Sequence, residues 1–230
     1  MKKTFWSLLF VLIATILLPA ARATSFSLDV SSGCCGAGPY GSVQLTQNGA
    51  NEVDVFVNLN PGFDFIWGGQ AGAFAFDLSV TGTPLITVSA GSLADGFSST
   101  VAGSKSSHSE HMAAFGYFNY AITGDANHTH GASQPIGQTL SFSVTDTSGI
   151  SISNFLHDST GGNYASYFAA DIYATDLSQV YCGPSATGIV GANDVPNTTN
   201  VNPTPEPATF LFAGLGLLGL GLLRRRPASR

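Results

Sequence analysis

The chain has 230 residues, which is enough for one main domain and short addressing segments. Residues 24–200 contain 13 Asp and Glu but only one basic residue, Lys105, so this region carries a net charge near −12. Such a region repels phosphate backbones and anionic lipid, which argues against a nucleic-acid-binding protein.

The first 23 residues have the pattern of a signal peptide. Two lysines precede an uncharged, mostly apolar helical run over residues 5–18, and Ala21-Arg22-Ala23 offers the small-x-small pattern that signal peptidase cuts. Fourteen helical residues span roughly 21 Å, which is shorter than the hydrocarbon core of a bilayer. We therefore expect cleavage after Ala23 and a mature chain that begins at Thr24, rather than an uncleaved anchor.

Alternating apolar residues predict β-strands throughout residues 24–191. The alternation is clearest in residues 51–59, 73–80, 139–144 and 167–174. Weaker strand patterns cover residues 25–30, 42–47, 85–89, 114–122, 150–156 and 188–191. Gly, Asn, Asp and Pro separate these segments, and no helical period is sustained. The pattern predicts an all-β body, either an antiparallel β-sandwich or a jelly roll.

Three cysteines, Cys34, Cys35 and Cys182, fit an exported protein with one disulfide and one remaining thiol. We favour a Cys35–Cys182 bridge, with Cys34 as the alternative partner of Cys182. A bridge from either neighbour closes a loop of about 148 residues, worth about 5 kcal/mol in the loop-entropy treatment. A vicinal Cys34–Cys35 bridge is the third possibility.

Four histidines form the only constellation suited to a transition metal. His108 and His111 are three residues apart, and His128 and His130 share one face of an extended chain. The predicted strand over residues 114–122 separates the two pairs by about 27 Å, unless a hairpin folds them together. We therefore favour no zinc site.

Four oxygen-bearing residues in turn-rich segments could bind Ca²⁺, namely Asp125, Asn127, Asp158 and Asn163. They lack the spacing of an EF-hand, and turn formation explains them equally well. The sequence therefore predicts no cofactor.

The end of the chain departs from the β pattern. Residues 192–204 are rich in Asn, Thr and Pro and predict a flexible linker. Pro205-Glu206-Pro207 follows, and the two prolines keep this tripeptide extended. An extended peptide that displays one carboxylate suits a processing enzyme with a cationic pocket.

A second apolar segment, residues 208–223, follows the tripeptide. Its 16 uncharged residues span about 24 Å as a helix, which is a marginal transmembrane length. Arg224, Arg225 and Arg226 come next, and basic residues stay on the cytoplasmic side. We expect this segment to halt export with the body outside the inner membrane.

The tripeptide, apolar helix and arginine cluster of residues 205–230 together resemble the PEP-CTERM sorting domain. That resemblance implies recognition by exosortase, a membrane-embedded processing enzyme of bacteria that produce exopolysaccharide. It also implies a transient single-pass intermediate in the inner membrane, followed by release to the cell envelope, surface or exterior.

The body itself shows no catalytic motif, so two hypotheses remain. The first is a non-catalytic surface or matrix protein that contacts exopolysaccharide or a neighbouring cell, with Trp67, Tyr117 and Tyr120 as candidates for stacking on sugars. The second is a secreted, zinc-assisted hydrolase of polysaccharide that uses the four histidines. We favour the first hypothesis.

Overall fold

A computed structural model describes residues 22–32, 38–68, 72–104, 106, 109–175 and 187–192. All of them belong to one compact unit, residues 21–199. The three cysteines, the predicted signal helix and the predicted transmembrane segment lie outside the described residues. Within the described parts of the chain, no helix has both the length and the apolarity needed to cross a membrane.

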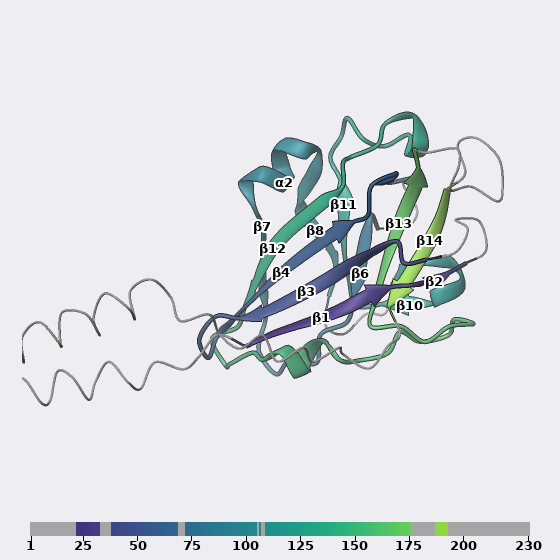
Figure 1. The fold of residues 1–230 in the computed structure, drawn as a ribbon. Coiled ribbons are helices and arrows are strands. Elements are labelled where there is room, and N and C mark those ends of the chain that lie inside the picture. Colours follow the sequence, from purple (N-terminus) through teal and green to yellow (C-terminus); the bar gives the residue numbers. More distant parts are fainter. Residues whose placement is uncertain are drawn as a thin grey trace, which may run out of the picture. The chain divides into compact units, whose positions relative to one another are not determined.

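Five antiparallel strands form the first sheet, in the order β1–β3–β4–β12–β7 (Figure 1). They are β1 (Ala23–Leu28), β3 (Gly41–Gln47), β4 (Glu52–Leu59), β12 (Thr139–Thr145) and β7 (Leu85–Val88). Val55 of β4 is paired with Leu45 on one side and with Phe142 on the other. These three side chains are buried on one face, as the period of two in the sequence predicts.

The second sheet is seven-stranded, in the order β2–β14–β13–β6–β11–β8, with β5 paired to β13. Its strands are β2 (Val30–Ser31), β5 (Phe63–Phe65), β6 (Phe74–Phe76), β8 (Phe97–Gly103), β11 (Tyr120–Gly124), β13 (Phe168–Ala174) and β14 (Thr187–Ala192). All its pairings are antiparallel. β14, the last strand, ends at Ala192. This is one residue beyond the predicted body, residues 24–191, and is the first residue of the predicted linker, residues 192–204.

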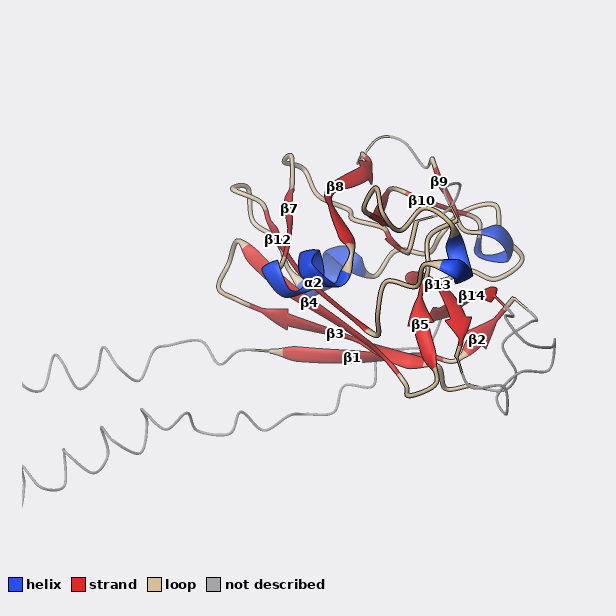
Figure 2. Ribbon diagram, turned by 90° about the horizontal axis from the view of Figure 1, so that it is seen from above, coloured by secondary structure: helices blue, strands red, loops and turns tan. Residues whose placement is uncertain are grey.

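Short helices and one small hairpin connect the strands. They are α2 (Ala90–Asp95), the 3₁₀ turns η2 (Ala113–Phe115), η3 (Gly131–Ser133) and η4 (Ile152–Phe155), and the paired strands β9 (Glu110–His111) and β10 (Tyr117–Phe118). The helix α2 lies against β12 (Figure 2) and is tied to it by a 2.8 Å bond from the Ser141 N–H to Ser92 Oγ.

A phenylalanine-rich core joins the two sheets face to face. The ring of Phe142, from the first sheet, lies 5.2 Å from that of Phe76 and 6.1 Å from that of Phe74, both in the second sheet. Phe26 and Phe168 make a similar contact at 5.1 Å. These contacts confirm an all-β body of antiparallel sheets, because each sheet buries its apolar face against the other.

A smaller apolar cluster covers part of the outer face of the seven-stranded sheet. Ala75, Ala121 and Ala169 form its floor. Met112, Phe115 and Phe118 lie above it, in the segment that contains β9, η2 and β10. Because alanine is small, the segment can pack closely onto the strands, and this packing positions β10 and the start of β11.

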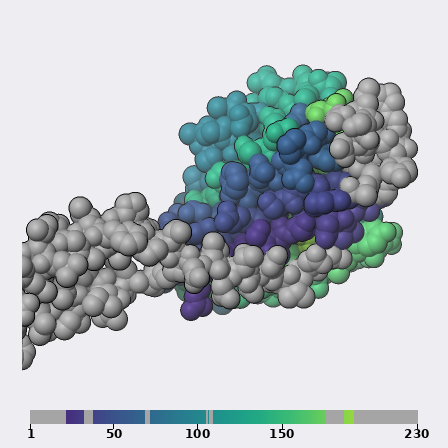
Figure 3. Space-filling model, in the orientation of Figure 1, coloured from purple at the N-terminus to yellow at the C-terminus, as the bar shows by residue number. Residues whose placement is uncertain are grey.

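Most outward-facing residues of β3, β4 and β12 on the five-stranded sheet are polar and at least partly exposed. One cross-strand row runs through Ser25, Gln44, Phe56 and Ser141. Phe56 is 43% exposed in the middle of this row. Residues of β3 and β4 are visible at the surface in Figure 3.

Several predicted strands have different boundaries in the structure. The strand predicted over residues 114–122 is divided into η2, β10 and β11, and the one predicted over residues 150–156 is the 3₁₀ turn η4. At η4, Asn154 Oδ1 accepts a 2.8 Å bond from the Ser151 N–H, which favours a turn over an extended chain. The strand predicted over residues 73–80 ends at Phe76.

Candidate functional site

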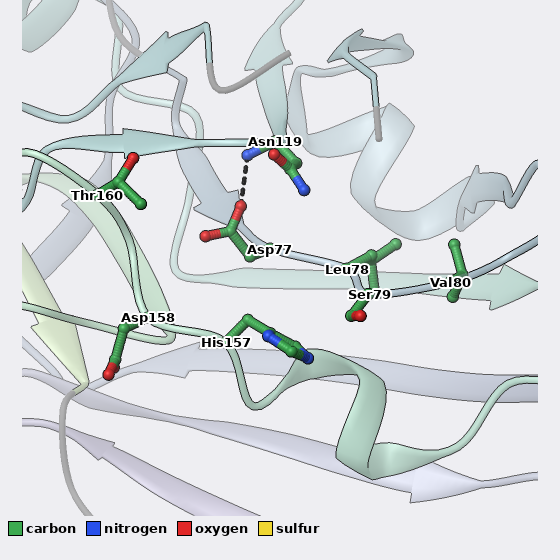
Figure 4. Close-up of a pocket in the computed structure, with 8 residues that line it drawn as sticks. All are labelled: Asp77, Leu78, Ser79, Val80, Asn119, His157, Asp158 and Thr160. Carbon is green, nitrogen blue, oxygen red and sulfur yellow. Dashed lines mark hydrogen bonds between the residues drawn. The ribbon is translucent and has the colours of Figure 1, made fainter. Parts of the chain in front are cut away.

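A cavity of about 400 Å³ opens where three chain segments meet beside β6 and β11. It is lined by Asp77, Leu78, Ser79, Val80, Asn119, His157, Asp158 and Thr160 (Figure 4). The first four residues follow β6, Asn119 lies between β10 and β11, and the last three follow η4. A pocket of this volume falls within the range of small-molecule sites.

Two buried polar residues form the inner wall of the cavity. Asp77 is 2% exposed, and its Oδ1 accepts a 2.6 Å hydrogen bond from the backbone N–H of Asn119 (Figure 4). Asn119 is 6% exposed, and its side-chain Oδ1 has no hydrogen-bond partner among the described residues. Buried hydrogen-bond acceptors without a donor are rare in folded proteins, so the position of Asn119 Oδ1 calls for a structural or functional explanation.

Hydrogen bonds to η4 fix the opposite rim of the cavity. The Ser79 N–H donates to the Asn154 carbonyl at 2.9 Å, and Asn154 Nδ2 donates to the Ser79 carbonyl. These bonds hold η4 against the segment that lines the cavity, so that the residues after η4 reach its mouth. The Asp158 carboxylate points away from that of Asp77 in Figure 4, so the two do not form the facing pair of a glycoside hydrolase.

An exposed tyrosine adjoins the cavity through Thr160. Tyr117 and Thr160 exchange two backbone hydrogen bonds, of 2.8 and 3.1 Å. The Tyr117 side chain is 42% exposed, and its ring centroid lies 4.7 Å from that of His111. An aromatic ring therefore stands at the surface next to a polar cavity.

Two glycines allow the loops around Tyr117 and Thr160 to approach each other. A Cβ on Gly116 would lie 2.3 Å from the Thr160 carbonyl oxygen, and one on Gly162 would lie 2.3 Å from the Phe115 carbonyl carbon. Gly116 also has a φ of 86°, which side-chain-bearing residues rarely adopt. The pairing of Tyr117 with Thr160 depends on this close backbone contact.

The candidate transition-metal ligands that the structure describes lie in β9 and in the loop between β11 and η3. His108 is outside the described residues, and His111 is in β9 against Tyr117. His128 Nδ1 lies 2.7 Å from Asp125 Oδ1, and His130 Nδ1 lies 2.8 Å from Gln134 Oε1. Among the described residues, no group of three or more His, Cys, Asp or Glu is arranged to hold a metal ion.

The four residues named as possible calcium ligands divide between two places. Asp125 and Asn127 share one turn, in which the Asn127 N–H donates to Asp125 Oδ1 at 2.8 Å. The hydrogen bond with His128 holds the pKa of Asp125 below its usual range. Asp158 lines the cavity, and the Asn163 N–H bonds the Ala114 carbonyl.

Two carboxyl groups on the outer face of the seven-stranded sheet have raised pKa values. Burial raises the pKa of Asp171 to about 7 and also raises the pKa of Asp64, which a hydrogen bond with Gln138 partly offsets. Asp64 is paired with Tyr173, two residues along β13 from Asp171. The two residues are therefore diagonal neighbours on one face.

The three aromatic residues predicted to stack on sugars have different environments. Tyr120 is buried, and Trp67 is half-buried against the main core. Tyr117 is exposed, as a sugar-stacking residue must be. Phe56, on the five-stranded sheet, and Tyr164 are two further exposed rings that the sequence analysis did not select.

Comparison with known proteins adds information about the end of the chain. Residues 203–226 match the family described as the PEP-CTERM protein-sorting motif. The chain carries a PEP-CTERM motif. The match confirms the resemblance inferred from the tripeptide, apolar segment and arginines.

The PEP-CTERM motif indicates an exported protein that exosortase sorts. It contains Pro205-Glu206-Pro207 and Arg224, Arg225 and Arg226, all of which lie outside the described residues. No curated protein and no solved structure matches this chain.

The cavity residues Asp77 and Asn119 were missed in the sequence analysis. A signal for Asp77 is present, because "AFAF" before it is apolar at both odd and even positions. A strand that is apolar on both faces is buried on both, so the acidic residue directly after it is expected to be buried too. Asn119 has no comparable signal.

Proposed function

We propose that this protein is a non-catalytic component of the cell surface or extracellular matrix that associates with exopolysaccharide. The PEP-CTERM motif at residues 203–226 is the observation that carries the proposal, since it indicates export and exosortase sorting. The acidic charge of residues 24–200 supports a soluble role outside the cell. The exposed Tyr117 and the polar cavity beside it provide a surface suited to sugars.

The proposed route to the surface has two cuts. Signal peptidase removes residues 1–23, and the apolar segment at residues 208–223 then holds the chain in the inner membrane as a single-pass intermediate. Exosortase recognises Pro205-Glu206-Pro207 and separates the body from the membrane segment. The linker at residues 192–204 keeps the tripeptide accessible, and the three arginines stop export.

Mass measurement of the exported protein tests this route. In cells with exosortase, we expect a product that begins at Thr24 and has lost Arg230. In cells without exosortase, or with Glu206→Ala, we expect a membrane-bound chain that keeps Arg230. Unchanged masses in all three samples would overturn the sorting part of the proposal.

Co-sedimentation with the exopolysaccharide of the producing cells tests the association. We expect the processed protein to pellet with the polymer and to leave its chain length unchanged. A protein that stays in the supernatant at every polymer concentration would refute the association, and a shortened polymer would refute the non-catalytic role.

A further inference from the structure

The expected signal-peptidase site coincides with the first strand of the folded body. β1 begins at Ala23, so the bond expected to be cut, between Ala23 and Thr24, is part of the strand. In the register of the first sheet, Ala23 is paired with Thr46 and Thr24 with Leu45, both in β3. The two residues that flank the cut are therefore built into the sheet while the chain is still uncut.

Contacts on both sides of this bond hold the start of β1 in place. Before the bond, the Gln47 N–H donates a 2.8 Å hydrogen bond to the Arg22 carbonyl. After it, Phe26 is 1% exposed. The Phe26 ring lies 6.0 Å from that of Tyr167 and 5.1 Å from that of Phe168. Moving β1 out of the sheet breaks backbone hydrogen bonds and exposes a buried aromatic ring, so it costs free energy.

A protease needs its substrate to leave such surroundings. Its catalytic groups must reach the carbonyl carbon of the peptide bond, and the flanking residues must enter the groove of the enzyme. Cleavage of a folded protein therefore proceeds through a locally opened state, at a rate that falls with the population of that state. β1 is the end strand of the first sheet (Figure 1), so its separation from β3 is the opening required.

The order of the strands sets the time at which this protection begins. β3 ends only 24 residues beyond Ala23, and β4, the next strand of the same sheet, ends at Leu59. Two strands alone are marginally stable in water, whereas three with an apolar face are more stable. The ring partners of Phe26 follow much later, at Tyr167 and Phe168. Protection therefore begins once β4 has been exported and is complete when β13 has followed.

We propose that signal-peptide removal has to precede the pairing of β1 with β3, so that cleavage and folding compete for the same residues. A precursor that folds first becomes resistant to signal peptidase. The cut is a hydrolysis in which the bond from the Ala23 carbonyl carbon to the Thr24 nitrogen breaks, while water gives its oxygen to that carbon and its protons to that nitrogen. This inference rests on the proposed cut after Ala23 and adds an order of events to it.

Cleavage of the full-length, uncut chain by purified signal peptidase in detergent micelles tests this order. The chain is supplied either folded, as shown by resistance of its body to an added general protease, or freshly diluted from urea. We expect the initial rate of cutting after Ala23 to be at least about tenfold lower for the folded chain. Equal rates, or an uncut chain whose body never becomes protease-resistant, would overturn the proposal.

Two insertions of the same six-residue Gly-Ser spacer locate the effect. A spacer between Ala23 and Thr24 moves the cut site out of β1, and the folded variant should be cut as fast as the unfolded chain. The matched control has the spacer between Asn197 and Thr198, in the predicted linker, and should stay protected. Loss of protection in both variants, or in neither, would refute the role of β1. If the first variant does not fold, the comparison of folded and unfolded unchanged chains decides.

Sequencing the new N-terminus separates this inference from the proposed function. If the unfolded chain is not cut after Ala23, the signal-peptidase step of the proposed route fails. If it is cut there and the folded chain is cut equally fast, that step stands and the proposed order of cleavage and folding is wrong.

Discussion

The backbone N–H of Asn119 donates a 2.6 Å hydrogen bond to Oδ1 of Asp77 in a place where both residues are almost fully buried. This bond joins the end of β6 to the start of β11, two strands that also pair directly. Because it bridges two neighbouring strands, the bond helps to hold the cavity wall in place.

Asp77→Leu should be strongly destabilising. It leaves the buried Asn119 N–H without its acceptor, and we expect the free energy of unfolding to fall by about 2–3 kcal/mol. Asp158→Leu, at an exposed position on the same cavity, should change it by less than about 0.5 kcal/mol. Urea denaturation measures both, and an equal effect of the two changes would contradict the structural role of Asp77.

Asn119→Leu should not destabilise the protein as Asp77→Leu does. Because Asn119 Oδ1 has no partner among the described residues, its removal should leave stability unchanged or raise it by about 1 kcal/mol. Asn154→Leu is the matched control, because that side chain accepts from the Ser151 N–H and donates to the Ser79 carbonyl. It should lose about 1–2 kcal/mol. A larger loss for Asn119→Leu than for Asn154→Leu would show that the Asn119 amide is satisfied.

Acid should stabilise the body through Asp171. Its pKa is about 7 in the folded chain and near 3.8 in the unfolded chain, so the folded state binds more protons between these values. Stability should therefore fall as pH rises from about 4 to 7, by up to about 4 kcal/mol from this group. Asp64 contributes in the same direction. Asp171→Asn should make the free energy of unfolding depend less on pH and should stabilise the protein at pH 8. Chemical denaturation at several pH values measures this dependence, and an unchanged slope in the variant would refute the prediction.

Phe142→Ala should open a cavity between the sheets. The ring is 2% exposed and lies against Phe74 and Phe76, so we expect a loss of about 3–5 kcal/mol. Phe56→Ala, on the outer face of the neighbouring strand, should cost less than about 1 kcal/mol. Thermal and urea unfolding measure the stability of both variants. Similar losses of unfolding free energy for Phe142→Ala and Phe56→Ala would contradict the assignment of inner and outer faces.

Gly162→Ala should destabilise the loop around the cavity. The added Cβ would collide with backbone atoms of Phe115 and Gly116, and we expect a loss of about 1–3 kcal/mol. Gly91→Ala is the matched control, because its Cβ would meet nothing closer than 4.0 Å within α2. It should stabilise the protein by about 0.5–1 kcal/mol. Comparable melting temperatures for the two variants would argue against the close backbone contact at Gly162.

The long alternating strands could be predicted from sequence because local periodicity and burial agree in them. Residues 52–59 alternate without interruption, and Val53, Val55, Val57 and Leu59 are all buried. The strand prediction for residues 150–156 was wrong, because their apolar spacing also suits a short 3₁₀ turn. The hydrogen bond from the Ser151 N–H to Asn154 Oδ1 favours that turn. The strand Phe97–Gly103 was missed because "SST" in its centre has little apolar character, and strand pairing with β11 decides its structure instead.

The cavity could not be predicted, because its residues come together only through the fold. Asp77 and Asn119 are 42 positions apart, and the bond between them follows from the pairing of β6 with β11. The sorting motif was predictable because its parts are adjacent in the chain, within residues 203–226. A local sequence pattern is therefore enough to find the sorting motif, whereas the cavity depends on how β6 and β11 pair in the folded protein.

The pairing of β2 with β14 has a consequence for the timing of export. Val30, one of the first residues of the body to leave the membrane, pairs with Gly191, one of the last. Contacts this distant in sequence form late, because the intervening chain must first be available. The seven-stranded sheet therefore cannot close until nearly the whole body has been translocated. We therefore expect the body to finish folding only when the motif at residues 203–226 is close to the membrane, which can be checked by probing when the β2–β14 pairing forms during export.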